Sequence, residues 1–136
     1  MRASIWTLLL AVLFGCSAGS GDDPEAGTSL VDQLKANGLR VESRGSIEQS
    51  FFSVPATVYA VDGDDLQVYE YASVSAAETD AAKVAPNGAI GTSMPMWVAP
   101  PHFFRRDSIV AIYLGSSPKT IGVLRQILGQ QFAGSP

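Results

Sequence analysis

The segment TVYAVDGDDLQVYEY, residues 57–71, decides the fold class. Residues 57–61 are rich in β-branched and aromatic side chains, which favour a strand. Residues 66–71 alternate so that successive side chains point to opposite faces of a second strand. Because the tetrapeptide DGDD, residues 62–65, is a strong turn signal, the segment predicts an antiparallel β-hairpin.

A second hairpin is predicted nearer the C-terminus. Residues 102–105 are expected to pair with the run IVAIYL, residues 109–114, across a turn at residues 106–107. The run 109–114 is apolar on both faces, which is typical of a central strand that is covered on both sides. Two shorter strands are expected, one at residues 39–42, where apolar and polar side chains alternate, and one at residues 96–98.

Three helices are predicted around these strands. The first begins at Ser29, whose hydroxyl can cap the first turn, and ends before Gly38. The second opens with the capping box SAAE, residues 75–78, and runs to Val84. The third follows Ser117, a further capping residue, and has a proline in its first turn. Irregular segments are expected at residues 44–46, 89–95 and 134–136.

The hairpins and the helices between them place the chain in the α+β class. We expect one domain, residues 29–133, built as an antiparallel or mixed sheet of about four to six strands with two to three helices packed against it. A chain of 136 residues is long enough for one hydrophobic core of ordinary size.

The net charge and the cysteine and histidine counts exclude several classes of function. The formal net charge is −4, which argues against nucleic-acid binding. Cys16 is the only cysteine, so a disulfide within one chain and a zinc site made of several cysteines are excluded. His102 is the only histidine, which limits the catalytic sites that the chain can build.

The N-terminus has the anatomy of a secretory signal peptide. Arg2 supplies a positive charge, and residues 5–14 are apolar apart from one threonine, a run too short to span a membrane. The run ends in LFGC, residues 13–16, which resembles the lipobox of bacterial lipoproteins. This resemblance implies that a signal peptide, residues 1–15, is removed and that Cys16 carries a covalent lipid. We expect no other cofactor.

The same resemblance implies a location for the protein. Acylated Cys16 would hold the chain at the lipid bilayer, on the extracytoplasmic side of the cell envelope. If the host has an outer membrane, the periplasmic face of that membrane is the expected place. Residues 16–28 contain no large apolar side chain and predict a flexible tether between lipid and domain. The alternative is an ordinary signal peptide cleaved near Ala18, so that Cys16 is lost.

Three further segments are similar to a group of small bacterial lipoproteins of unknown function. They are FFSVP at residues 51–55, WVAPPHF at residues 97–103 and LGQQFA at residues 128–133. The resemblance covers most of the chain that follows the signal peptide. It implies no particular activity.

The stretch of residues 97–104 is the candidate interaction surface. It contains aromatic side chains, is broken by prolines and has Arg105 and Arg106 beside it, a composition typical of interface anchors. We expect contacts with another envelope protein or a small ligand at Trp97, His102, Phe104 and Arg105. Because no set of catalytic residues is recognisable, the chain is interpreted as a non-catalytic binding or assembly module.

Two alternative functions would use His102. The first is a soft-metal site made of Met94, Met96, Trp97 and His102. Thioether and imidazole groups suit Cu(I) or Ag(I), and these residue types are similar to those of a small periplasmic copper-chaperone family, although the spacing differs. The second is a small hydrolase in which His102 acts as a base beside a serine, but the chain has no Gly-x-Ser-x-Gly motif after a strand.

Overall fold

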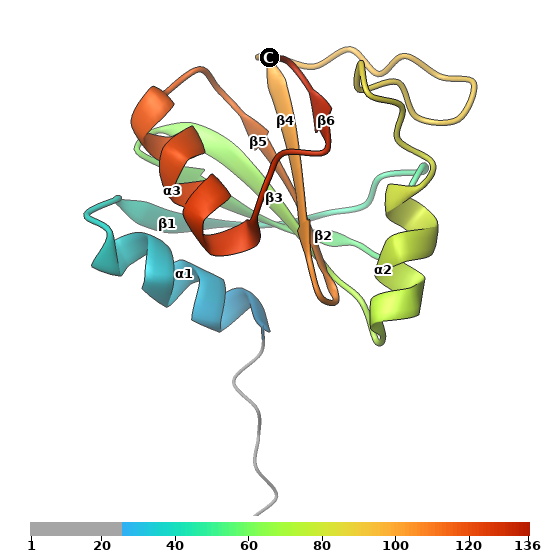
Figure 1. Ribbon diagram of the computed structural model, residues 1–136. Helices are drawn as coiled ribbons and strands as arrows, with labels where there is room; N and C mark the ends of the chain where they lie inside the picture. Colours follow the sequence, from blue (N-terminus) through green and yellow to red (C-terminus); the bar gives the residue numbers. More distant parts are fainter. Residues whose placement is uncertain (1–25) are drawn as a thin grey trace, which may run out of the picture.

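The computed structural model describes residues 26–136 as one antiparallel sheet with helices on both of its faces (Figure 1). The helices are α1 (Ala26–Ala36), α2 (Val74–Ala81) and α3 (Pro118–Leu128). The strands are β1 (Val41–Ile47), β2 (Ala56–Val61), β3 (Asp64–Glu70), β4 (Pro101–Arg106), β5 (Ile109–Leu114) and β6 (Ala133–Gly134). This architecture confirms the predicted α+β class. The predicted signal peptide and Cys16 lie outside the described residues.

The sheet has the strand order β1-β2-β3-β5-β4-β6, and every neighbouring pair is antiparallel. The first predicted hairpin is confirmed, with a shorter turn than expected. Only Asp62 and Gly63 connect β2 to β3, with φ angles of 49° and 93°. A two-residue hairpin turn requires positive φ angles, which glycine adopts without strain. Asp64 and Asp65 belong to β3 instead.

Strand β5 lies between β3 and β4 and is buried along its whole length, as predicted for residues 109–114. Its alternate side chains enter two separate hydrophobic cores, because successive residues of a strand point to opposite faces. On one face, α1 and α3 cover a core that includes Leu34 and Phe104. On the other face, α2 and two loops cover a core that includes Tyr69 and Phe103.

The two faces of the sheet differ in their cover. α1 and α3 have 11 residues each and lie together on one face (Figure 1). α2 has only eight residues and covers one end of the opposite face. The rest of that face is covered by residues 48–55 and 86–100, which form neither helix nor strand. We call these segments the short loop and the long loop.

Two predicted features of the strands are wrong. The turn expected at residues 44–46 is a β-bulge inside β1, where Gly45 has a φ of 94° and the register with β2 shifts. Residues 96–98, expected as a strand, belong to the long loop. Pro95 and Pro100 on either side of them have no N–H to donate to a neighbouring strand, which disfavours pairing there.

The end of the chain is more ordered than predicted. Residues 134–136, expected to be loose, lie against β4. Strand β6 pairs Ala133 with Phe103, and the Ser135 N–H donates to the Pro101 carbonyl at 2.7 Å. A strand of two residues is too short to show an alternating pattern, so the sequence did not reveal it.

Of the three predicted helix starts, one agrees with the structure. Ser117 is the N-cap of α3, as predicted. α1 begins at Ala26 rather than at Ser29, so the end of the predicted tether is helical. The capping box predicted at residues 75–78 is wrong, because the N-cap of α2 is Ser73. The backbone of Ser73 is extended, with a φ of −150°, and its side chain accepts a hydrogen bond from the first turn at 3.1 Å.

Candidate functional site

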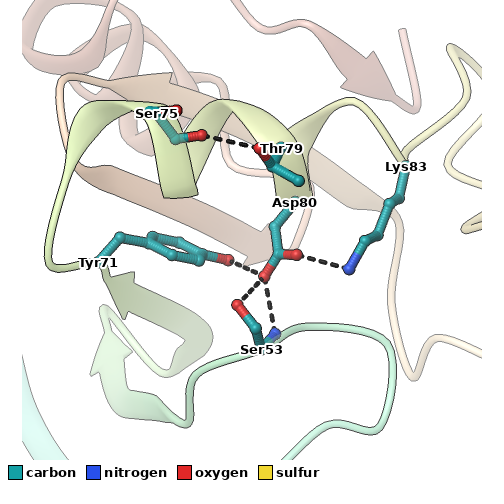
Figure 2. Close-up of polar contacts among 6 residues, drawn as sticks. All are labelled: Ser53, Tyr71, Ser75, Thr79, Asp80 and Lys83. Atoms are coloured by element: carbon teal, nitrogen blue, oxygen red, sulfur yellow. Dashed lines mark hydrogen bonds and ion pairs between the residues drawn. The ribbon is translucent and has the colours of Figure 1, made fainter.

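Asp80 on α2 holds the short loop in place (Figure 2). The residue is 2 % exposed. Its Oδ2 atom accepts hydrogen bonds from the N–H and the hydroxyl of Ser53, each at 2.7 Å, and from the Tyr71 hydroxyl at 3.0 Å. The Lys83 ammonium donates to Oδ1 at 2.6 Å. Donors from the short loop, from the end of β3 and from the end of α2 therefore converge on one carboxylate.

The protonation states in this cluster are those of a structural contact between α2 and the short loop. Burial opposes ionisation of Asp80, but hydrogen bonds from Lys83, Ser53 and Tyr71 outweigh it and lower the pKa of Asp80 from 3.8 to about 2. The pKa of Tyr71 is raised above its usual value of 10, first by burial and then by the hydrogen bond to Asp80. Near neutral pH, Asp80 therefore stays ionised and Tyr71 stays protonated. Neither group is poised to exchange a proton with a substrate.

Sequence analysis did not identify Asp80, although the sequence contains a signal. Ala77, Ala81 and Val84 form the buried stripe of this segment, and Asp80 lies on that stripe at helical spacing. α2 itself ends at Ala81, yet Val84 remains buried in the structure. A carboxylate on a buried stripe needs partners. The partners were not recognisable because one of them, Ser53, is 27 residues away in the chain.

The anchored short loop meets the long loop through aromatic contacts. Phe52 packs edge-on against Tyr69 in the core, with ring centroids 4.7 Å apart. Its neighbour Phe51 packs edge-on against Trp97 of the long loop at 6.0 Å. Trp97 also contacts Phe103 on β4, at 5.8 Å. The Trp97 ring therefore fixes the long loop between the short loop and the sheet.

The residues around Trp97 expose large apolar side chains to solvent. Met94, Met96 and Val98 are 63 %, 99 % and 87 % exposed. Within residues 26–136, the only other exposed large hydrophobic residue is Val74 on α2. We call residues 94–98 the exposed stretch. Scattered exposed apolar residues are normal, whereas three within five residues form a local patch.

A cleft of about 250 Å³ lies between the two loops, over the start of β3 and the end of β5. Its apolar lining includes Phe51, Met96 and Trp97. Its polar lining is Gln49, Asp65 and Gln67. The Gln67 side chain is positioned by the Tyr69 hydroxyl, which donates to Oε1 at 2.8 Å. The Asp65 carboxylate lies 3.1 Å from the Arg44 guanidinium, and both side chains are substantially exposed.

Trp97 also carries an unsatisfied donor. Its Nε1–H group is buried and has no hydrogen-bond partner within the described part of the chain. A buried donor without a partner costs about 1–3 kcal/mol. Such groups are rare in folded proteins.

His102 is a structural residue in this arrangement, at 2 % exposure. Its Nδ1 atom lies 3.0 Å from Oε1 of Gln131, and Nε2 lies 2.9 Å from the Gly115 carbonyl oxygen. Gln131 in turn donates through Nε2 to the carbonyls of Ala133 and Ser135. His102 therefore ties β4 to the chain end, and both ring nitrogens are engaged.

The predicted interaction surface is corrected at two residues. Phe104 is fully buried in the core under α1 and α3, and His102 is buried on the same strand, because β4 is covered on both faces. Neither residue belongs to an exposed surface. Arg105 is partly exposed, and its guanidinium lies 3.7 Å from the Glu78 carboxylate. Of the four predicted residues, Trp97 borders the cleft.

The predicted soft-metal residues are not assembled at one site. The Trp97 ring packs on Phe103, on the face of the sheet that α2 covers. The His102 side chain points to the opposite face of β4. The centroid of its ring lies 5.9 Å from that of Tyr113, which belongs to the other core. Met94 and Met96 project into solvent. Among residues 26–136, no group of three or more His, Cys, Asp or Glu side chains is placed to hold a metal ion.

A larger hollow of about 390 Å³ lies between α1, α3 and the turn after β4. Its apolar residues Leu30, Ile127 and Leu128 are buried parts of the core. One of its two charged residues, Arg106, donates to the Ile127 carbonyl at 2.5 Å at the end of α3. Since this hollow has no exposed large apolar side chain in the described chain, the smaller cleft is the better candidate site.

Comparisons with known proteins add no further assignment. A scan against protein-family models gives no match, and searches of curated proteins and of solved structures find no significant similarity. Within residues 26–136, no helix is both long enough and apolar enough to cross a lipid bilayer. The candidate site is therefore defined by its own geometry.

Proposed function

We propose that this protein is a lipid-anchored binding or assembly module of the bacterial cell envelope, and that it holds its partner at the cleft and the exposed stretch. The observation that carries the proposal is the exposure of Met94, Met96 and Val98 around Trp97, at the border of the cleft. Keeping three apolar side chains in water is unfavourable unless another molecule covers them.

The chemistry of the patch supports a binding role. Interface anchors are enriched in tryptophan, and they are surrounded by contacts that exclude water. Met96 has a flexible, polarisable side chain that can adapt to the shape of a partner. Trp97 is held by two aromatic neighbours, so the centre of the patch is already ordered before a partner arrives.

The anchor is the second half of the proposal. The LFGC segment supports acylation of Cys16, which would tie the domain to the bilayer on the extracytoplasmic side. One acyl chain binds membranes only marginally, whereas two or more anchor a protein stably. The acidic net charge of −4 gives no electrostatic attraction to anionic headgroups, so the lipid would supply the anchoring.

The geometry gives no support to the two alternatives that use His102. A hydrolase needs a histidine nitrogen within reach of a nucleophile, and both nitrogens of His102 are bonded to other groups. A copper site needs His102 beside the methionines, but the His102 side chain points to the face of the sheet opposite Trp97. Binding therefore explains more of the observed features than either alternative.

The binding half is tested by cross-linking in living cells. A photoreactive benzophenone side chain is placed at position 96, and a matched variant carries it at position 74, where Val74 is the exposed apolar residue on α2. We expect a specific adduct with an envelope protein from position 96 and none from position 74. Equal adducts from both positions, or no adduct from position 96, would overturn the proposal.

The anchor half is tested by fatty-acid labelling. Cys16→Ser replaces the sulfur by a poorly nucleophilic hydroxyl, so the variant should take up no labelled fatty acid. It should also lose partition into the detergent phase. If the wild type itself takes up no label, Cys16 is part of an ordinary signal peptide, and the lipid anchor is rejected.

A further inference from the structure

We infer that the cleft receives an extended peptide segment of the partner, with one bulky apolar side chain in the cleft and basic residues beside it. This inference rests on the proposed function and names the chemistry of the partner at the same site. Three observations carry it: the size of the cleft, the state of the main chain along its rim, and the charge around it.

The size of the cleft limits what it can hold. Ligand pockets for whole cofactors or drug-sized molecules occupy roughly 300–1,000 Å³. The cleft is about 250 Å³ and is walled on its apolar side by Phe51 and Trp97, with the exposed Met96 at its rim. This space suits one large apolar side chain with the main chain lying outside. A side chain of this kind would also cover the exposed stretch, which forms the rim.

Pro95 and Pro100 cannot donate a hydrogen bond, but in the described part of the chain residues 96–99 between them keep unpaired N–H and C=O groups at the rim. Within residues 26–136, no hydrogen bond is found to the main chain of residues 94–99. The long loop is held before this segment, where the Ile90 N–H donates to the Ser93 carbonyl at 2.9 Å, and after it, where the Pro100 carbonyl accepts from Gly115 at 3.1 Å. An extended peptide supplies N–H and C=O groups at regular intervals to such a segment.

The charge around the cleft selects a basic partner. The chain has a net charge of −4, and the charged residue among those that line the cleft is acidic. Asp65 is the acidic residue that lines the cleft, and its pair with Arg44 is exposed to solvent. Exposed pairs of this kind contribute little to stability, so a cation from a partner can replace Arg44 at the Asp65 carboxylate. Complementary charge also steers the encounter and rejects acidic sequences.

The inference is tested by selecting ligands from a random library of ten-residue peptides displayed on phage. The target is the full-length protein in mild detergent, and selection is repeated on Met96→Ser/Val98→Ser and on the control variant Val74→Ser. We expect the wild type and the control to enrich peptides with a central aromatic or large aliphatic residue flanked by lysine or arginine. The Met96→Ser/Val98→Ser variant should lose this enrichment, because its patch is no longer apolar.

Affinities of one enriched peptide then separate the two contributions. Replacing its central residue by serine should weaken binding at least about tenfold, which is typical of a buried anchor. Replacing its basic residues by glutamate should weaken binding to the wild type but have a smaller effect on Asp65→Asn. The exposed acidic residue Asp107, in the turn after β4, gives the matched control Asp107→Asn, which should behave as the wild type.

Several results would overturn the inference. One is enrichment of peptides without an apolar centre, and another is enrichment that survives in Met96→Ser/Val98→Ser. A third is tighter binding of a soluble N-acetylglucosamine oligosaccharide than of any peptide, which would assign the cleft to a glycan. If the cross-link from position 96 persists in cells while no peptide is selected, the proposed function stands and the peptide inference fails.

Discussion

The two faces of the sheet are covered by different elements: α1 and α3 cover one face, the closed face, and α2 and two loops cover the other, the looped face. On the first face, two helices of 11 residues close a core of mainly aliphatic side chains. On the second face, a helix of eight residues leaves room for two loops, which are held by the Asp80 carboxylate and by aromatic contacts. Both faces bury a hydrophobic core, but the exposed large side chains of the long loop, Met94, Met96 and Val98, belong to the looped face.

The largest expected effect lies on the closed face. Phe104→Ala removes a fully buried ring from the core under α1 and α3 and should lower the free energy of unfolding by about 3–5 kcal/mol. Urea denaturation followed by circular dichroism gives the value. Arg105→Ala, the neighbouring residue on the same strand, is the control and should change it by less than about 1 kcal/mol. A small effect of Phe104→Ala would mean that the buried ring contributes little to the stability of this core.

A smaller effect is expected at the anchor of the looped face. Asp80→Asn should lower the free energy of unfolding by about 2 kcal/mol at pH 7, because the ionised carboxylate accepts hydrogen bonds from Ser53, Tyr71 and Lys83. Amide hydrogen exchange should become faster in the short loop and stay unchanged in α1. Equal exchange in both regions would contradict the view that Asp80 holds the short loop.

The same residue predicts a pH dependence. The folded-state pKa of Asp80 is about 2, below its usual value of 3.8, so the unfolded chain binds this proton more readily. The contribution of Asp80 to stability is therefore complete above pH 4 and is lost as the pH falls through 2. In Asp80→Asn this part of the acid dependence should be missing, and a wild-type curve in the variant between pH 4 and pH 2 would rule out the assignment.

Mutations that release the C-terminal end of the chain should lower the free energy of unfolding by a still smaller amount. His102→Ala removes the contacts to Gln131 and to the Gly115 carbonyl and should cost about 1–2 kcal/mol, with faster amide exchange at Ser135. Gln131→Ala should give a similar result, because it releases the same end of the chain. If His102→Ala abolishes a cellular activity with unchanged stability, the residue has a functional role and the structural assignment is wrong.

The sequence could predict the regular part of this molecule. Residues 109–114 are apolar at every position, so their burial on both faces was readable, and the Asp62-Gly63 turn was readable from its residue types. These are local signals, carried by neighbours in the chain. The three helices were found for the same reason, although two of their starts were misplaced.

The parts that depend on distant partners could not be predicted. Asp80 and Ser53 are joined only by the folded chain, and His102 reaches Gln131 from 29 residues away. A histidine or a phenylalanine on a strand also looks the same in sequence whether its face is covered or exposed, which is why Phe104 was placed at the surface. The exposed stretch was recognised only in part, since burial of its neighbours decides which side chains remain outside.

The smallest effect on stability should come from the exposed stretch, and it tests the central claim most directly. In living cells, a benzophenone side chain at position 49, where Gln49 of the short loop lines the cleft, reports the partner with and without Met96→Ser/Val98→Ser. The account predicts that the free energy of unfolding changes by less than about 0.5 kcal/mol while the cross-link disappears, and that Val74→Ser retains it. A cross-link that persists in the folded Met96→Ser/Val98→Ser variant would contradict the claim that this face binds the partner.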